Sequence, residues 1–160
     1  MKVSASAVKV AAGGHIDILV TFTNKSKDAI PLTFTIDPLP RFDIEAYDAK
    51  NHRVDMPPKG PPPLPSGVPA RVPGDPKSAR VMLAANGTAR VRLGWDAVKT
   101  KWAPEKLKGT PPEKGYPRTP NGPLAKGKYV LRVVMPLVGV FEGMEKEVSA
   151  PKLPIEVSTK

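Results

Sequence analysis

Few residues of this chain combine in patterns that carry out chemistry. The histidines are His15 and His52, which fall at the start of an alternating segment and in a polar turn. The sequence has no His-x-x-x-His pair, no Gly-x-Ser-x-Gly turn and no cysteine. Zinc hydrolases, serine hydrolases and thiol enzymes depend on those patterns. We therefore expect a protein that is not an enzyme and that needs no metal and no cofactor.

Acidic residues offer the one arrangement that could hold a cation. Asp43 and Glu45 are two residues apart, on one face of an expected strand, and Asp48 follows. Carboxylate oxygens at such spacing can bind Ca²⁺ or Mg²⁺. However, the acids alternate with Phe42 and Ile44, as in a strand with one solvated face. The exposed polar face is the favoured interpretation.

Methionine and histidine are residue types that can bind copper, so a copper site must also be considered. Their scattered spacing instead favours side chains that fill the core or contact loops (Met56, Met82, Met135 and Met144). We expect no copper site.

Proline and positive charge are concentrated in two stretches. Residues 50–77 hold nine of the 21 prolines and residues 99–128 hold six. The same stretches carry net charges of +3 and +6, out of +10 for the whole chain. We therefore predict two long, basic, proline-rich loops at about 57–77 and 96–127, whose charge is solvated or offered to a partner.

Four residues of these stretches are the candidate binding residues. Lys59 precedes a Pro-Pro-Pro-Leu-Pro run, a pattern that can dock in aromatic grooves or simply form a stiff loop. Arg71 lies between Pro69 and Pro73, and Trp102 and Tyr116 are aromatic residues of the second stretch. The expected binding residues are thus Lys59, Arg71, Trp102 and Tyr116.

The isoelectric point of about 9.9 suggests nucleic acid as the first partner to consider. Nucleic acid is not favoured, because the basic residues are not interleaved with aromatic ones and no RNA-binding signature is present. A protein or an anionic polysaccharide fits better.

Apolar residues at alternate positions predict strands through most of the chain. Segments His15–Asn24 and Ile30–Ile36 alternate in this way, and we expect them to form a hairpin through the turn at 25–28. Segments 79–83 and 89–95 flank Asn86-Gly87, which predicts a second hairpin. With further strands at 3–10, 42–47, 126–135 and 153–157, the prediction is one domain, residues 1–160, with an all-β immunoglobulin-like Greek-key β-sandwich of seven to nine strands.

The remaining segments give weaker expectations. Residues 97–108 could form one or two helical turns, although Pro104 prevents a long helix. An exposed edge strand is expected at Val3–Val10 or at the C-terminal strand, where a partner strand could be added.

The compartment is predicted from two absences in the sequence. Lys9 and several serines interrupt the first ten residues, so no signal-peptide core is present and the chain as written is expected to be cytoplasmic. A removed signal peptide would place it in the periplasm or outside the cell. No window is apolar enough to span a membrane.

Several motifs together resemble the bacterial intracellular proteinase inhibitor family and related bacterial immunoglobulin-like modules. They are Val20-Thr-Phe-Thr-Asn24 with Ser26, Leu32-Thr-Phe34, Arg41-Phe-Asp-Ile-Glu-Ala-Tyr-Asp48, Ala84-Ala-Asn-Gly-Thr88 leading to Gly94-Trp95-Asp96, and Leu124-Ala-Lys-Gly-Lys-Tyr-Val-Leu131. The resemblance covers roughly residues 14–135. It implies an immunoglobulin-like fold and inhibition of a proteinase.

The expected function is therefore protein binding without catalysis. In one version the chain inhibits a proteinase through a proline-rich loop that carries Arg71. The alternative is an accessory module of a cell-envelope assembly that binds anionic polysaccharide or a partner protein through Trp102, Tyr116 and the basic loop.

Overall fold

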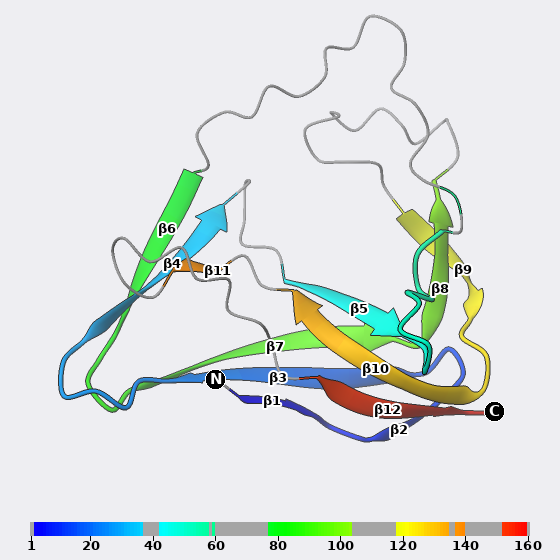
Figure 1. Ribbon diagram of the computed structural model, residues 1–160, viewed down its shortest axis with the longest axis horizontal. Helices are drawn as coiled ribbons and strands as arrows, with labels where there is room; N and C mark the ends of the chain where they lie inside the picture. Colours follow the sequence, from blue (N-terminus) through cyan, green and yellow to red (C-terminus); the bar gives the residue numbers. More distant parts are fainter. Residues whose placement is uncertain are drawn as a thin grey trace, which may run out of the picture.

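All the regular structure that the computed structural model describes is β-strand (Figure 1). The described residues are 2–36, 42–57, 59, 77–103, 118–134, 137–139 and 152–159. Their strands are β1 (Lys2–Ala5), β2 (Lys9–Ala11), β3 (His15–Thr23), β4 (Ile30–Ile36), β5 (Asp43–Tyr47), β6 (Lys77–Leu83), β7 (Thr88–Asp96), β8 (Val98–Trp102), β9 (Arg118–Pro123), β10 (Gly127–Val134), β11 (Leu137–Gly139) and β12 (Leu153–Ser158). The predicted all-β class is confirmed. No helix that could cross a membrane occurs in the described ranges.

These strands form four hydrogen-bonded groups. One sheet has the order β1-β3-β7, and a second has the order β2-β12-β10-β5. Strand β4 lies between β11 and β6, and β8 pairs with β9. Every ladder is antiparallel except that of β2 with β12.

One hydrophobic core joins the β1-β3-β7 sheet to the β2-β12-β10-β5 sheet. Alternate residues of β3 are buried, and Ile18 and Val20 are 0% exposed. They belong to the same cluster as buried residues of β5, β7, β10 and β12 (Ala46, Trp95, Tyr129, Leu131, Val133, Ile155 and Val157). The period-two patterns therefore identified the inward faces correctly, since burial of alternate apolar side chains is what stabilises each strand.

The two predicted hairpins are wrong. Strand β3 pairs with β7 over nine residues, from His15 opposite Asp96 to Thr23 opposite Thr88. Strand β4 pairs with β6, from Ile30 opposite Leu83 onward. Each connection thus bends the chain sideways instead of reversing it. Alternation fixes which face of a strand is buried but not which strand lies beside it.

A buried asparagine forms the corner between these two pairs. Asn24 is 2% exposed, and its Nδ2 group donates to the carbonyl oxygens of Asp28, Leu83 and Ala84 at 2.8, 3.1 and 2.9 Å. Its Oδ1 atom accepts from the backbone N–H of Ser26 at 2.9 Å. One side chain therefore satisfies the backbone of both bends.

Backbone contacts complete this corner. The N–H of Asn24 donates to the carbonyl of Gly87 (2.9 Å), and the N–H of Asn86 donates to the carbonyl of Ser26 (3.3 Å). Asn86 has a φ of 55°, the left-handed conformation that asparagine tolerates better than most residues. The Asn-Gly signal therefore marks a real turn, although the flanking strands pair elsewhere.

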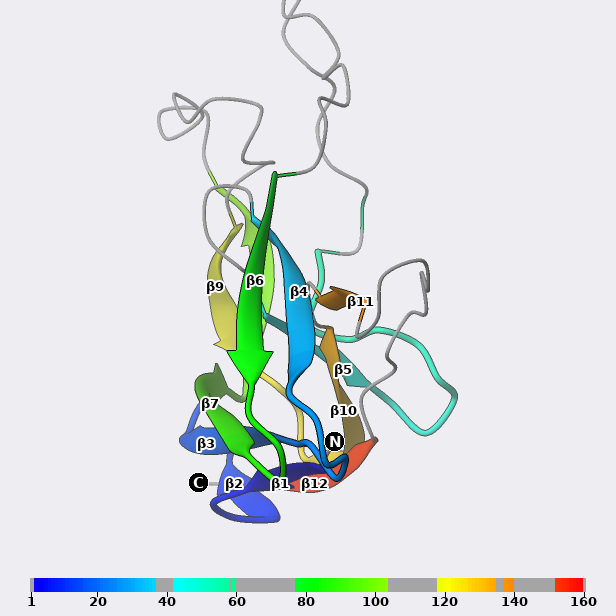
Figure 2. The same cartoon turned by 90° about the vertical axis from the view of Figure 1, so that its left-hand side faces the viewer.

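Two pairs of strands rise from the layer of β3 and β7, on the same side and at opposite ends (Figures 1 and 2). We call β4 with β6 the first arm, and β8 with β9 the second arm. The second arm corrects the sequence analysis, because strands occur inside the loop expected at 96–127 and in place of helical turns at 98–102. Val98, Thr100 and Trp102 alternate with lysines, a strand pattern that the prolines obscured. Twelve strands are thus described, more than the seven to nine expected.

The chain ends also differ from expectation. The strand expected at Val3–Val10 is divided into β1, beside β3, and β2, beside β12. Both are sheet edges, as predicted. Strand β12 lies between β2 and β10, so the expectation of an open C-terminal edge strand is wrong. The turn predicted at Asp48–Asn51 is confirmed by hydrogen bonds between Asp48 and both Asn51 and His52.

Candidate functional site

The structure brings together two of the four predicted binding residues. The indole N–H of Trp102, at the end of β8, donates to the carbonyl oxygen of Lys59 at 2.9 Å. Lys59 is exposed and Trp102 is half-buried. Arg71 and Tyr116 lie outside the described residues.

A second contact joins residues close in sequence to the ends of the undescribed stretches. An Nη1–H of Arg118, at the start of β9, donates to the sulfur of Met56 at 2.7 Å. Met56 and Lys59 precede the undescribed residues 60–76, while Trp102 and Arg118 flank the undescribed residues 104–117. We call these four residues the root cluster. It ties together the points from which the two proline-rich stretches depart.

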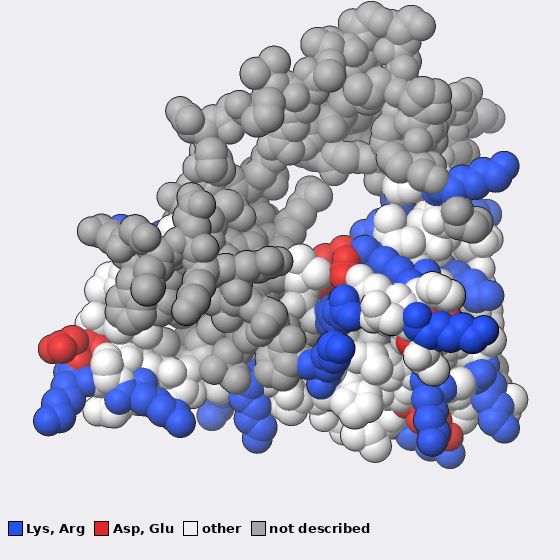
Figure 3. All heavy atoms as spheres, viewed as in Figure 1, with Lys and Arg blue, Asp and Glu red and all other residues white. Residues whose placement is uncertain are grey.

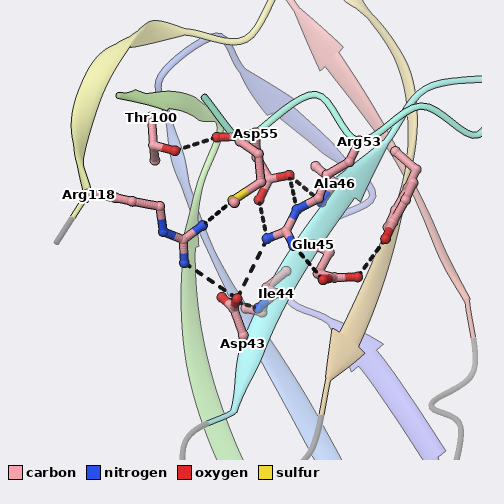
Figure 4. A network of polar contacts seen from close by, with 10 residues as sticks. Asp43, Ile44, Glu45, Ala46, Arg53, Asp55, Thr100 and Arg118 are labelled. Carbon is pink, nitrogen blue, oxygen red and sulfur yellow. Dashed lines mark hydrogen bonds and ion pairs between the residues drawn. The ribbon is translucent and has the colours of Figure 1, made fainter. Parts of the chain in front are cut away.

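An ion-pair network supports the root cluster (Figure 4). Arg53 donates from Nε to Asp55 Oδ1 at 2.9 Å, and its Nη1 lies 2.5 Å from Glu45 Oε1. Asp43 Oδ2 lies 3.6 Å from Arg53 Nη2 and 3.5 Å from Arg118 Nη2. Three carboxylates and two guanidinium groups therefore face one another across β5, the segment after it, and β9.

Asp55 is the best-protected member of this network. It is 7% exposed, and Oδ1 also accepts from the backbone N–H of Ala46 at 3.3 Å. Its carbonyl oxygen accepts from both the backbone N–H and the hydroxyl of Thr100 on β8, at 2.9 and 2.6 Å. The network thus fixes the second arm against β5.

Charge stabilises the cationic form of Arg53. Partial burial alone would lower the pKa of its guanidinium group, but the hydrogen bond and charge of Asp55, with the charges of Glu45 and Asp43, outweigh burial and raise the pKa. Arg53 therefore remains protonated at all physiological pH values.

The network extends to β10 through an aromatic ring. The Tyr47 hydroxyl donates to Glu45 Oε2 at 2.7 Å, and this hydrogen bond raises the pKa of Tyr47. The guanidinium carbon of Arg132 lies 4.2 Å from the centre of the Tyr47 ring, and its Nη2 donates to Asn51 at 2.6 Å. Stacking of this kind holds a cation over the ring face.

The acidic residues considered for a cation are therefore already engaged. Asp43 and Glu45 face guanidinium groups, whereas Asp48 accepts hydrogen bonds from the N–H groups of Lys50 and His52 at 2.9 and 2.8 Å. The bond from His52, chiefly, lowers the pKa of Asp48. No group of three His, Asp or Glu side chains in the described ranges could hold a metal ion. The sequence reasoning missed Arg53, although two acids on one strand face followed by an arginine after the turn could have indicated it.

Basic charge is distributed differently from the prediction. Five of the eight basic residues in 99–128 lie on β8, β9, β10 or the turn before β10, and not in a loop (Lys99, Lys101, Arg118, Lys126 and Lys128). Figure 3 shows blue side chains over the right-hand part of the molecule, where these strands lie. A folded pair of strands thus presents much of the charge.

A separate depression of about 410 Å³ lies away from the root cluster. It is mostly apolar and is formed by β10, β12 and neighbouring turns (Val8, Ala49, Lys128, Tyr129, Val130, Pro154, Ile155 and Glu156). None of the predicted binding residues lines it.

Comparison with known proteins provides no further guide to the site. No family model matches the chain, and a search of curated proteins finds no match.

Proposed function

We propose that this protein is a non-enzymatic protein-binding module in which the two proline-rich stretches act together as one recognition surface. The observation that carries the proposal is the root cluster, where Trp102 bonds to Lys59 and Arg118 bonds to Met56. Because proline restricts the backbone, a stretch with a fixed origin pays less entropy on binding. Two such stretches with one common origin can engage one partner.

The proposed architecture is an immunoglobulin-like β-sandwich. This proposal is supported by the division of the N-terminal segment into two strands. Strand β1 is antiparallel to β3 in one sheet, and β2 is parallel to β12 in the other. The orders β1-β3-β7 and β2-β12-β10-β5 and the shared core also fit two facing sheets.

A proteinase is the proposed partner, on the basis of the family resemblance and of Arg71 between prolines. A basic residue held in a stiff segment can enter a proteinase cleft and resist turnover. The test is titration against a trypsin-like and a subtilisin-like proteinase, with Arg71→Ala and, as a control for charge, Lys126→Ala. Inhibition that Arg71→Ala removes and Lys126→Ala preserves is expected. If neither proteinase is slowed, the inhibitor proposal fails.

A cell-envelope accessory module is the second candidate, favoured by the lysines that alternate with Trp102 on β8. Lys99 and Lys101 are exposed on that strand. Binding to an anionic polysaccharide would combine these charges with the tryptophan ring. Retention on a sulfated polysaccharide resin should fall with salt and with Trp102→Ala, but much less with Trp102→Phe. Retention that Trp102→Ala leaves unchanged would eliminate this candidate.

A further inference from the structure

We infer that the outer edge of β6 and β7 binds an extended acidic segment of a partner protein by strand addition. This surface is separate from the root cluster, so the inference does not depend on the proposed function. Among the described residues, β6 pairs with β4 alone and β7 with β3 alone (Figure 1). Their free edges follow one another along the chain, through the corner at residues 84–87.

The other sheet edges carry features that discourage strand addition. Strands β1, β2 and β11 have only four, three and three residues. On β8, the N–H of Thr100 already donates to the carbonyl oxygen of Asp55. Strand β9 contains Pro120 and Pro123, which cannot donate to a ladder. Beside β5, the bridge from Tyr47 to Arg53 and the bond from the Val54 N–H to Ala46 occupy part of the edge. By contrast, β7 has nine residues and no proline, which is the type of edge that accepts another strand.

An incompletely covered apolar row follows this edge. Val81 is 49% exposed, although Leu32, directly opposite it on β4, is only 3% exposed. On the inward face of β7, Ala89, Val91 and Leu93 are only partly buried against the core. A strand placed beside β7 would cover these side chains with its own inward row, provided that this row is apolar.

The outward row of β7 determines the charge of the partner. Arg90 and Arg92 are exposed and lie opposite Thr21 and Leu19 of β3, so neither has a carboxylate directly opposite it, although Asp17 is diagonal to Arg92. Asp96, the one acid of β7, is bonded to His15. An added strand would place its outward side chains beside the two arginines, where opposite charges are favourable and like charges are unfavourable.

A second copy of the chain satisfies this requirement poorly. An antiparallel pair of β7 strands centred on Val91 would place Arg90 opposite Arg92 of the other copy. An extended segment that alternates acidic and apolar residues meets both rows of the edge, and this is the occupant that we propose.

The test uses synthetic peptides and amide exchange of the full chain. The probe is the capped peptide Thr-Val-Glu-Val-Glu-Val-Glu-Val-Thr. One control has lysine at each glutamate, and the other has proline in place of the valine at the fourth position. Titration calorimetry should show the glutamate peptide binding about tenfold or more tightly than either control. Hydrogen exchange should show new protection in β7.

Two charge-reversal variants make the test specific to this edge. The double variant Arg90→Glu with Arg92→Glu should reverse the preference to the lysine peptide. The matched variant Lys99→Glu with Lys101→Glu changes the net charge equally on β8 and should retain the preference for glutamate.

Several results would overturn the inference. They are equal binding of the glutamate and lysine peptides, new protection confined to other strands, and an unchanged preference in the arginine variant. Protection of the β7 edge in the free protein would show that the chain covers it itself, and dimerisation through β7 in sedimentation experiments would show that a second copy occupies it.

Discussion

The two arms are both antiparallel strand pairs that leave the ribbon of β3 and β7, yet they are fixed in different ways. The bend into the first arm depends on the single side chain of Asn24, whose amide group donates hydrogen bonds to three backbone carbonyl oxygens. The bend into the second arm relies on backbone bonds around Ala97, which is 0% exposed. Its carbonyl accepts from Gly13 and Leu124, and its N–H donates to Gly14. Asp55 then attaches the second arm to β5.

The two arms also differ in how much of their surface is engaged by other parts of the molecule. The second arm has charged side chains paired on its inner side and carries the root cluster. The first arm leaves β6 unpaired on one side among the described residues. Single substitutions should therefore be most damaging at the first corner and should act more locally in the second arm.

The largest effect is expected for Asn24→Ala. It leaves the buried carbonyl of Leu83 and the part-buried carbonyls of Asp28 and Ala84 without this donor. Unsatisfied groups of this kind are costly, so the free energy of unfolding should fall by about 3 kcal/mol. Chemical denaturation would measure the loss. Asn24→Asp keeps the shape but removes the donors and should be at least as damaging. A loss below about 1 kcal/mol in both variants would show that the corner does not depend on this amide.

The next largest effect is expected for Arg53→Met. The substitution keeps most of the volume but leaves Glu45 and Asp55 without their cation, and we expect a loss of about 2 kcal/mol after allowing for partial solvent screening. Arg53→Lys should recover only part of it, since a lysine cannot bond to both carboxylates in the same geometry. Equal stability of the Met and Lys variants would contradict a role for charge.

A smaller and local effect is expected for Trp102→Phe. It removes the N–H that bonds to Lys59 and keeps an aromatic ring, so global stability should change by about 1 kcal/mol or less. Amide exchange near residues 56–59 and 101–103 should accelerate, while the β3–β7 ladder stays protected. Unchanged amide exchange near both 56–59 and 101–103 would indicate that this hydrogen bond does not join the two proline-rich stretches.

The smallest effect is expected from the titration of His15, at the base of the second arm. The hydrogen bond that His15 Nδ1–H donates to Asp96 Oδ1, at 2.6 Å, raises the pKa of His15. The stabilisation from this pair is present below about pH 6.5, the ordinary histidine pKa, and is lost as the pH rises through the raised value in the folded state. Proton NMR should give a pKa above the ordinary histidine value, and Asp96→Asn should lower the pKa of His15. A pKa unaffected by Asp96→Asn would contradict this assignment.

The sequence predicts the faces of strands better than their partners. Alternation correctly identified the buried residues of β3, β10 and β12, because burial follows from local order alone. The pairing of β3 with β7 depends on a corner built by Asn24 and residues about 60 positions away. No local pattern contains that information.

The candidate site was only partly accessible to sequence reasoning. Residue types selected Lys59 and Trp102, which the fold brings together. Met56 and Arg118 could not be selected, because their contact requires β9, which was expected to be a loop. Arg71 and Tyr116 remain predictions.

The parallel pairing of β2 with β12 has a mechanical consequence. Lys9, Val10 and Ala11 of β2 lie beside Glu156, Val157 and Ser158 of β12, and the two strands point the same way. Tension applied through the two ends of the chain would pull these strands in opposite directions along their length. The hydrogen bonds of such a ladder are loaded together in shear and are not opened one by one. The chain should therefore resist a force applied through its two ends better than it resists a force that separates β10 from β5 one hydrogen bond at a time.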